Sequence, residues 1–153
     1  MGRNKLLIRS ATESDLQAAF RLMDELGYPD LSIARFAETY SSVQKHPAMT
    51  LIVAEDGGEI VGLASVSRRP QLRLTADLIT IDELVVADSA RGLGVGGALL
   101  EHVKAMAGNL GARRLELETN RARESYRRGF YIKNGFTEAD SAVMRIEYEF
   151  DDK

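Results

Sequence analysis

The sequence contains no cysteine and only two histidines, His46 and His102, among its 153 residues. The absence of cysteine excludes disulfides, thiolate metal sites and a cysteine nucleophile, and two histidines give little support to a histidine-based metal cluster. His46 precedes a proline in a predicted turn, and His102 lies at the edge of a predicted helix face, so neither is assigned a function. We therefore expect no metal, and a cytoplasmic protein, because a chain without cysteine suits a reducing compartment.

Long apolar runs and an excess of positive charge are also absent. The N-terminal part has only residues 6–8 as an apolar run, which is too short for a signal peptide, and no later stretch could span a bilayer. The net charge of −3 gives no broad attraction to nucleic acid. We expect neither a membrane nor a nucleic-acid partner. A hydrophobic content of 44% is enough for one core, so residues 1–153 are predicted to form a single domain.

Hydrophobic periodicity predicts an α/β fold with the element order β-α-α-β-β-β-α-β-α-β. The Asp-Gly-Gly turn at residues 56–58 predicts a β-hairpin. Because antiparallel and crossover connections are mixed, we expect a mixed sheet with helices on both faces, and residues 68–77 as the longest irregular stretch. Strands are predicted at residues 6–9, 50–55, 59–67, 78–87, 115–119 and 142–150, and helices at 16–26, from 33 to before 46, at 94–108 and at 125–134.

Four glycines gather in residues 91–97, where a predicted strand leads into a predicted helix. Glycine lacks the Cβ that would hold an anion at a distance, and the first N–H groups of a helix favour negative charge. Arg91 adds a cation at the rim. The loop therefore predicts a phosphate-bearing ligand.

Two nucleotide-binding motifs are alternatives for this loop. Residues 92–97 match the dinucleotide pattern G-x-G-x-x-G, with Glu116 or Glu118 about where a ribose-binding acid would lie. That match is weak, because only 56 of the 153 residues follow Gly97, too few for the βα units that such a fold needs. A Walker loop is excluded, because no Gly-Lys-Ser/Thr follows the glycines.

The chain resembles the GCN5-related N-acetyltransferase (GNAT) family, whose signature Arg/Gln-x-x-Gly-x-Gly/Ala stands here at residues 91–96. Further similarity lies in residues 8–11, 56–62, 83–86 and 130–136, so the resemblance covers essentially the whole chain. It implies the GNAT acyl-CoA N-acyltransferase fold and acetyl coenzyme A (acetyl-CoA) as the cosubstrate. The glycine loop would hold the pyrophosphate, and the strand before it would pair with the pantetheine arm.

The same resemblance implies the cofactor-binding residues. The backbone N–H of Val86 would receive the developing oxyanion. Arg127 and Arg128 are favoured on different grounds as contacts of a cofactor phosphate, because they share the predicted helix beside Tyr131. A solvated helix face is the alternative interpretation for most of the nearby arginines. The expected cofactor contacts are Leu84, Val85, Val86, Arg91, Gly92, Leu93, Gly94, Val95, Gly96, Gly97, Asn120 and Arg127.

Two residues are candidates for proton transfer. Tyr131 matches the family tyrosine that protonates the departing thiolate, and the alternative is that it merely packs against Phe130 and Phe136. Glu83 is the preferred base, with Asp82 or water as alternatives. Strict alternation would send Asp82 and Glu83 to opposite faces of the strand, whereas a bulge would change that parity.

The acceptor is expected to be a primary amine of a small molecule, acetylated by direct attack in a ternary complex. Among family members, the segments 83–86, 90–93 and 119–120 look most like aminoalkylphosphonate acetyltransferases. A peptide or protein acceptor, either an N-terminus or a lysine, is the enzymatic alternative. A non-catalytic acyl-CoA binding or sensing module is the alternative of another class. The sequence does not specify the oligomeric state, and a homodimer is one alternative.

Overall fold

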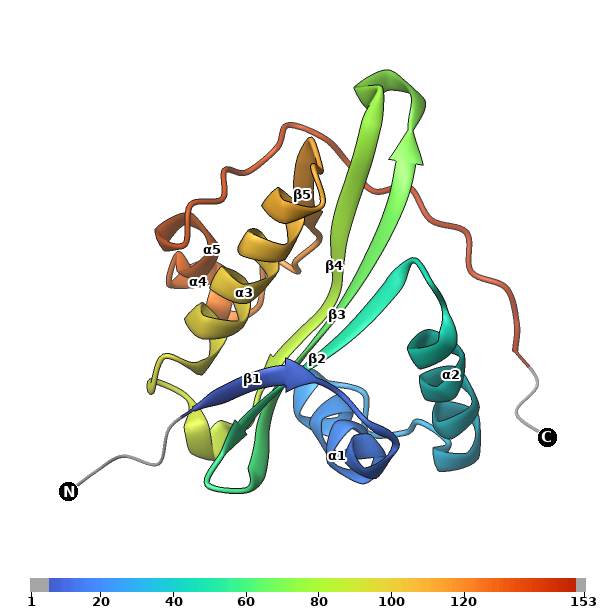
Figure 1. Cartoon of the computed structure of the whole chain (residues 1–153), viewed down its shortest axis with the longest axis vertical. Coiled ribbons are helices and arrows are strands. Elements are labelled where there is room, and N and C mark those ends of the chain that lie inside the picture. Colours follow the sequence, from blue (N-terminus) through green and yellow to red (C-terminus); the bar gives the residue numbers. More distant parts are fainter. Residues whose placement is uncertain (1–5, 151–153) are drawn as a thin grey trace. The chain divides into compact units, whose positions relative to one another are not determined.

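The computed structural model describes residues 6–150 (Figure 1). These residues divide into two compact units after Glu118. Each unit is described by itself. Within the described residues, no helix has the length and apolar character needed to cross a membrane.

The first unit is built on a five-stranded mixed sheet in the order β1-β2-β3-β4-β5. Strands β1 to β4 pair antiparallel with their neighbours, and β5 runs parallel to β4. The parallel pair is possible because a helix, α3 (Val95–Asn109), connects its two strands. The strands are β1 (Leu7–Ser10), β2 (Met49–Asp56), β3 (Glu59–Gln71), β4 (Ala76–Val86) and β5 (Arg114–Leu117).

Three helices of the first unit cover the two faces of this sheet: α1 (Leu16–Leu26), α2 (Ile33–Lys45) and α3 (Val95–Asn109). The chain enters α1 through Thr12, whose N–H donates to the Asp15 carboxylate at 2.8 Å. It leaves α1 at Gly27, which has the left-handed φ of 112° that ends many helices. The hydroxyl of Ser32 caps α2 by accepting the Arg35 N–H at 3.3 Å.

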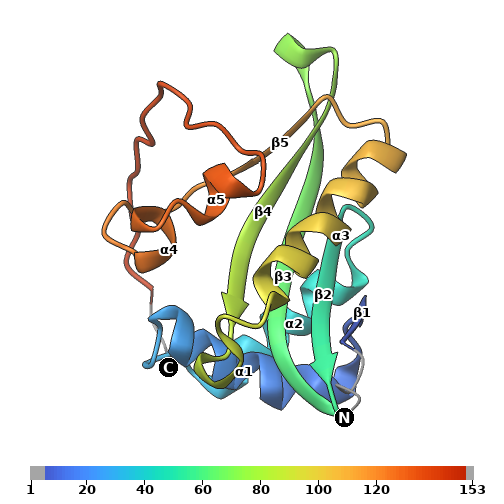
Figure 2. The same ribbon diagram turned by 90° about the vertical axis from the view of Figure 1, so that its left-hand side faces the viewer.

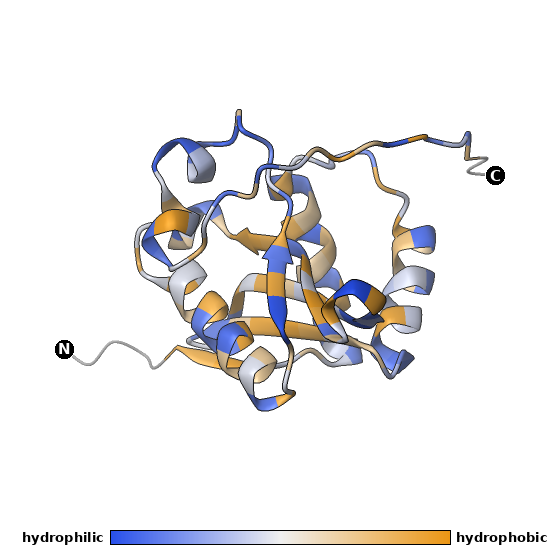
Figure 3. Cartoon of the chain, turned by 90° about the horizontal axis from the view of Figure 1, so that it is seen from above, coloured by the Kyte–Doolittle hydropathy of each residue, from blue (hydrophilic) through white to orange (hydrophobic). Residues whose placement is uncertain are grey.

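Alternation along β3 divides the core of this unit into two halves. Leu63 belongs to a buried cluster with residues of α1 and α2, including Leu22 and Tyr40. Gly62 faces α3, since a Cβ on Gly62 would come within 3.0 Å of the Leu99 and Val95 side chains. A close helix–sheet approach therefore requires glycine here. Figure 3 shows apolar residues along the strands and along one side of the helices.

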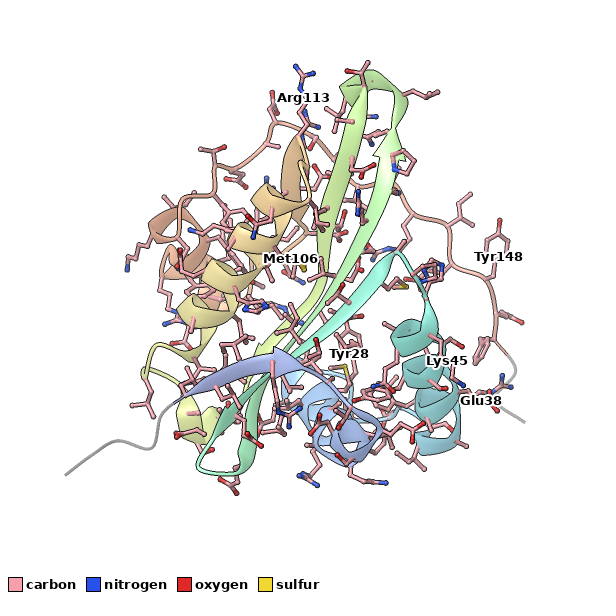
Figure 4. The ribbon with its side chains drawn as sticks, in the orientation of Figure 1. Tyr28, Glu38, Lys45, Met106, Arg113 and Tyr148 are labelled. Atoms are coloured by element: carbon pink, nitrogen blue, oxygen red, sulfur yellow. The ribbon has the colours of Figure 1, made fainter. Side chains whose placement is uncertain are left out.

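The predicted irregular stretch at residues 68–77 is wrong. Strand β3 continues to Gln71, a short 3-10 turn spans Leu72–Leu74, and β4 begins at Ala76, so that the two strands form one long hairpin (Figure 2). Charged residues and Pro70 hide the strand periodicity in the sequence. In the structure, an ion pair of 2.6 Å between Arg68 Nε and Asp77 Oδ2 joins the two strands. Arg113 (Figure 4) holds the turn by donating to the Leu74 carbonyl at 3.2 Å.

The second unit contains two short helices, α4 (Glu124–Arg127) and α5 (Phe130–Lys133), where one helix at 125–134 was predicted. Gly129 separates them with a left-handed φ of 71°. The predicted final strand at 142–150 is also wrong, because no strand is assigned to that segment within the described residues. Its apolar residues are exposed, among them Met144 and the labelled Tyr148 of Figure 4. The segment keeps the alternating pattern of a strand, but a strand also needs a partner for its hydrogen bonds.

Candidate active site

Strand β4 carries a bulge at the two acidic residues. Glu83 lies opposite Ser65 and Ile81 lies opposite Val66, so within the described strands Asp82 is the extra residue of β4. A bulge interrupts the regular alternation of side chains and re-aims those beside it.

The bulge places Asp82 and Glu83 on the same side of the sheet. The Ser65 hydroxyl donates a hydrogen bond to the Glu83 carboxylate, and the Ser67 hydroxyl lies near enough to the Asp82 carboxylate to lower its pKa. Ser65 and Ser67 are two residues apart on β3 and therefore share a face. Of the two alternatives left open by the sequence, the bulge applies to this strand, and strict alternation between Asp82 and Glu83 does not.

The two carboxyl groups differ in exposure and both have perturbed pKa values. Asp82 is exposed and Glu83 is half-buried. Burial raises the pKa of Glu83, and the neighbouring negative charge of Asp82 raises it further. Burial also raises the pKa of Asp82, against the opposing effects of the Ser67 hydroxyl and the Arg69 guanidinium. Both carboxyl groups therefore have raised pKa values, but a nearby cation opposes the increase only at Asp82 and not at Glu83.

Beyond this bulge, β4 presents part of its backbone at an open sheet edge. The pairing of β4 with β5 extends only from Leu78 to Ile81, and among the described strands residues 83–86 pair with β3 alone. Ala87 donates its N–H to the Val61 carbonyl at 2.8 Å. Because backbone groups of an antiparallel strand point alternately to its two sides, Val85 directs its N–H toward β3, whereas Leu84 and Val86 direct theirs away from it.

The glycine loop follows directly after a 3-10 turn at Asp88–Ala90. Gly92 and Gly94 have φ values of 78° and 84°, in the left-handed region that favours glycine. A Cβ at either position would meet no described atom within 4 Å, so their outer side is open. Gly94 is the N-cap of α3, and its carbonyl accepts the first helical hydrogen bond, from Ala98, at 3.0 Å. The N–H groups of residues 95–97 precede that bond and can serve another acceptor.

Acidic residues hold this loop in place. Arg91 Nη1 lies 2.8 Å from Asp88 Oδ1, and both side chains are largely exposed. The Asp88 N–H donates to the Glu25 carboxylate at 3.0 Å, which ties the loop to the end of α1. In the loop itself, Leu93 is exposed, whereas the Val95 side chain is buried against the sheet. The predicted rim cation is therefore present, already balanced by one carboxylate.

Tyr131 lies in α5 of the second unit. Its ring makes edge-to-face contacts with Phe130 and Phe136, at centroid distances of 5.0 and 6.1 Å. Burial raises the pKa of Tyr131, and the nearby Ser125 hydroxyl and Arg123 guanidinium lower it. The phenol is therefore kept protonated at neutral pH. This is compatible with the role of an acid and with the alternative role of packing.

The other predicted residues of the second unit have local partners or face solvent. Asn120 Oδ1 accepts the Ala122 N–H at 2.8 Å, an Asx turn that uses its carbonyl oxygen. Arg127 is exposed in the last turn of α4. Arg128 lies 5.2 Å above the Phe130 ring centroid. For Arg128 the structural alternative is therefore the better description.

Three residues with side-chain contacts in these two units were not predicted from the sequence: Ser65, Ser67 and Glu138. Glu138 accepts hydrogen bonds from Arg121 Nε and the Tyr126 hydroxyl, both at 3.1 Å, and so closes the loop around α4. A serine within an apolar strand does not by itself indicate a functional role. Only the register of β3 against β4 shows that Ser65 and Ser67 face the two acids.

Comparison with known proteins adds independent information. The family model "Acetyltransferase (GNAT) family" matches residues 10–136. An aminoalkylphosphonate N-acetyltransferase from Salmonella typhimurium is 30% identical over 132 residues, which cover 86% of this chain and 85% of that protein. The solved structure of a transcriptional regulator from Bacillus halodurans is 27% identical, with a TM-score of 0.86 over 94% of this chain and 100% of that one.

A more distant neighbour shares the fold. It is an aminoglycoside N-acetyltransferase solved in complex with CoA, with 18% identity and a TM-score of 0.83 over 96% of this chain and 97% of that one. The predicted mixed α/β fold and the predicted family are confirmed. The chain belongs to the GNAT family and is an N-acetyltransferase, an acyltransferase of the kind that depends on acetyl-CoA.

Proposed function

We propose that this protein transfers the acetyl group of acetyl-CoA to a primary amine of a small molecule, by direct attack in a ternary complex. The observation that carries the proposal is the bulged end of β4. It offers a half-buried carboxylate, Glu83, and outward-directed backbone N–H groups at Leu84 and Val86, immediately before the glycine loop.

Acetyl-CoA would bind along β4 and the loop that follows. The pyrophosphate would accept hydrogen bonds from the backbone of residues 92–97 at the start of α3, with Arg91 as a nearby cation. The pantetheine arm would add to the open edge of β4 like another strand, through Leu84 and Val86. The N–H of Val86 would then donate to the thioester oxygen as negative charge develops there. Asn120 and Arg127 remain candidate contacts from the second unit.

Two proton transfers complete the reaction. An acceptor that arrives as an ammonium group first releases one proton to solvent. The neutral amine nitrogen then attacks the thioester carbon and loses a second proton to Glu83, directly or through water. The carbon–sulfur bond then breaks, and the CoA thiolate takes a proton from Tyr131. Burial raises the pKa of Glu83, which brings this carboxylate closer to the pKa of an effective base at neutral pH. Burial likewise raises the pKa of Tyr131, so that its hydroxyl still carries the proton that the thiolate would accept.

A small molecule that carries a primary ammonium group is the acceptor class that we favour. Asp82 lies on the same side of the sheet as Glu83, and its negative charge would attract an ammonium group before the proton is lost. One relative, 30% identical over 85% of its length, is named for aminoalkylphosphonates, which are small amines. This favours a small molecule over a protein N-terminus or lysine.

The test is the release of CoA thiol from acetyl-CoA in the presence of matched acceptors. Aminoalkylphosphonates, diamines and aminoglycosides form one set, and short peptides with a free N-terminus or lysine form the other. We expect turnover with members of the first set only. Turnover confined to peptides would contradict the proposed acceptor. Tight acetyl-CoA binding without acetylation of any acceptor would favour a binding or sensing module.

A further inference from the structure

The Ser65 side chain makes two hydrogen bonds to a single residue of the neighbouring strand. Its hydroxyl accepts the Glu83 N–H at 3.0 Å and donates to the Glu83 carboxylate. Ser65 is only 5% exposed and is one of two buried polar or charged residues in the described chain, the other being Asp15. A buried hydroxyl is costly unless its hydrogen-bonding groups are satisfied, and here one residue satisfies both.

This arrangement orients the hydroxyl proton. A serine hydroxyl has one donor hydrogen and two acceptor lone pairs. Because the Glu83 N–H occupies a lone pair, the single hydrogen is left for the Glu83 carboxylate. The bulge at Asp82 brings Glu83 opposite Ser65, so that backbone and side chain of the same glutamate reach the same hydroxyl.

Two consequences follow for the Glu83 carboxylate. The hydrogen bond restricts its rotamers, so that less conformational entropy is lost when a substrate amine must meet it. A donor to the carboxylate also favours the charged form, against the burial and the Asp82 charge that oppose ionisation. A base must be ionised to accept a proton, so both effects assist the same step.

We propose that Ser65 is the positioning residue of the Glu83 base, and that its hydroxyl fixes the orientation of the carboxylate and maintains its ionised form. The inference rests on the proposed function, in which Glu83 accepts the amine proton. Ser65 itself touches Glu83 and acts through it.

The experiment compares Ser65→Ala and Ser65→Thr with Ser67→Ala and Glu83→Gln. Ser67→Ala is the matched control, because it removes a hydroxyl from the same face of β3 but from beside Asp82. We would measure kcat/KM from about pH 5 to 9 with one amine acceptor, together with thermal unfolding. For Ser65→Ala we expect the acidic limb to move to higher pH, and kcat/KM on that limb to fall roughly tenfold or more.

The Ser65→Thr variant distinguishes the effect of losing the hydroxyl from a general effect on folding. Ser65→Thr keeps the hydroxyl and should restore the position of the limb. Ser67→Ala should not move the limb to higher pH, because loss of the Ser67 hydroxyl raises the pKa of Asp82, and an Asp82 that carries less negative charge lowers the pKa of Glu83. A parallel readout is the carbon NMR titration of the Glu83 carboxyl in protein labelled at glutamate, assigned by the signal that disappears in Glu83→Gln. Its midpoint should rise in Ser65→Ala and return in Ser65→Thr.

The outcomes distinguish this inference from the proposed function. If Glu83→Gln keeps the acidic limb, the base role fails, and the positioning role of Ser65 fails with it. If Glu83→Gln abolishes the limb, but Ser65→Ala lowers only the melting temperature and moves neither limb nor carboxyl midpoint, Ser65 is purely structural. In that case the base role stands and the inference is overturned.

Discussion

Asp82 and Glu83 are consecutive residues of β4, yet both side chains lie on the same side of the sheet, beside Ser67 and Ser65 respectively. The bulge between them creates two neighbouring carboxylates at the end of the strand. Their charges are therefore coupled, and a change to one alters the proton affinity of the other.

The first prediction concerns this coupling. Because the pKa of Glu83 is raised, the base is lost as the pH falls through a value above that of an ordinary glutamate. Glu83→Gln should therefore abolish the acidic limb of kcat/KM. Asp82→Asn removes the negative charge that raises the Glu83 pKa, so the limb should remain and move to lower pH.

Two acceptors with different amine pKa values control this experiment, because the acceptor must also lose a proton before attack. A limb that follows the acceptor pKa and survives Glu83→Gln would show that water removes the proton. Glu83 would then at most orient the substrate.

The second prediction concerns the hydroxyl of Tyr131. Tyr131→Phe keeps the aromatic contacts with Phe130 and Phe136 and should lower kcat by about 10²- to 10⁴-fold, the usual effect of losing a general acid, with little change in acetyl-CoA affinity. Tyr126→Phe is the matched control, because the Tyr126 hydroxyl binds Glu138 within the same unit. If both substitutions have equal, small effects on single-turnover rates, Tyr131 has only a packing role.

The third prediction concerns the glycine loop. Gly94→Val should weaken acetyl-CoA binding strongly, because valine strains a backbone with φ of 84° and occupies the open side of the loop. Gly108→Ala is the control, since it lies within α3 with no described atom within 4 Å of the added Cβ. Calorimetry should give binding of acetyl-CoA and none of NAD to the parent protein. Binding of NAD in place of acetyl-CoA would contradict the proposed use of the loop.

The fourth prediction concerns stability at low pH. Arg9 lies 2.7 Å from the Asp15 carboxylate, and chiefly its hydrogen bond lowers the pKa of Asp15 to about 2. A lowered pKa gives stability that is present above the ordinary value of 3.8 and is lost as the pH falls toward about 2. Asp15→Asn should lower the melting temperature at pH 7 and flatten its fall over that interval. An unchanged pH profile in this variant would assign the acid sensitivity to other groups.

Local chemistry made part of the fold predictable. Gly57 and Gly58 both have positive φ, as a tight hairpin turn demands, and the turn was readable from the sequence. The glycine loop and α3 were readable for a similar reason, since strand, loop and helix follow one another in the chain. The resemblance in residues 91–96 then pointed to the family.

Long-range pairing made the rest unpredictable. The bulge at Asp82 depends on the register of two strands whose paired residues, Ser65 and Glu83, are 18 positions apart. Nothing in the pattern near Ser65 marks it as a partner of Glu83. The segment at 142–150 has the alternation of a strand, but alternation specifies only which side chains share a face, and a strand forms when its backbone finds a partner.

Direct attack in a ternary complex is the central claim, and intact-mass measurement tests it most directly. The protein is mixed with acetyl-CoA alone, and then with acetyl-CoA and a small amine acceptor. We predict that the mass of the protein stays unchanged in both mixtures, while the acceptor gains one acetyl group and CoA thiol is released in equal amount. A stoichiometric acetyl adduct on the protein that forms without acceptor and disappears when the amine is added would contradict the account.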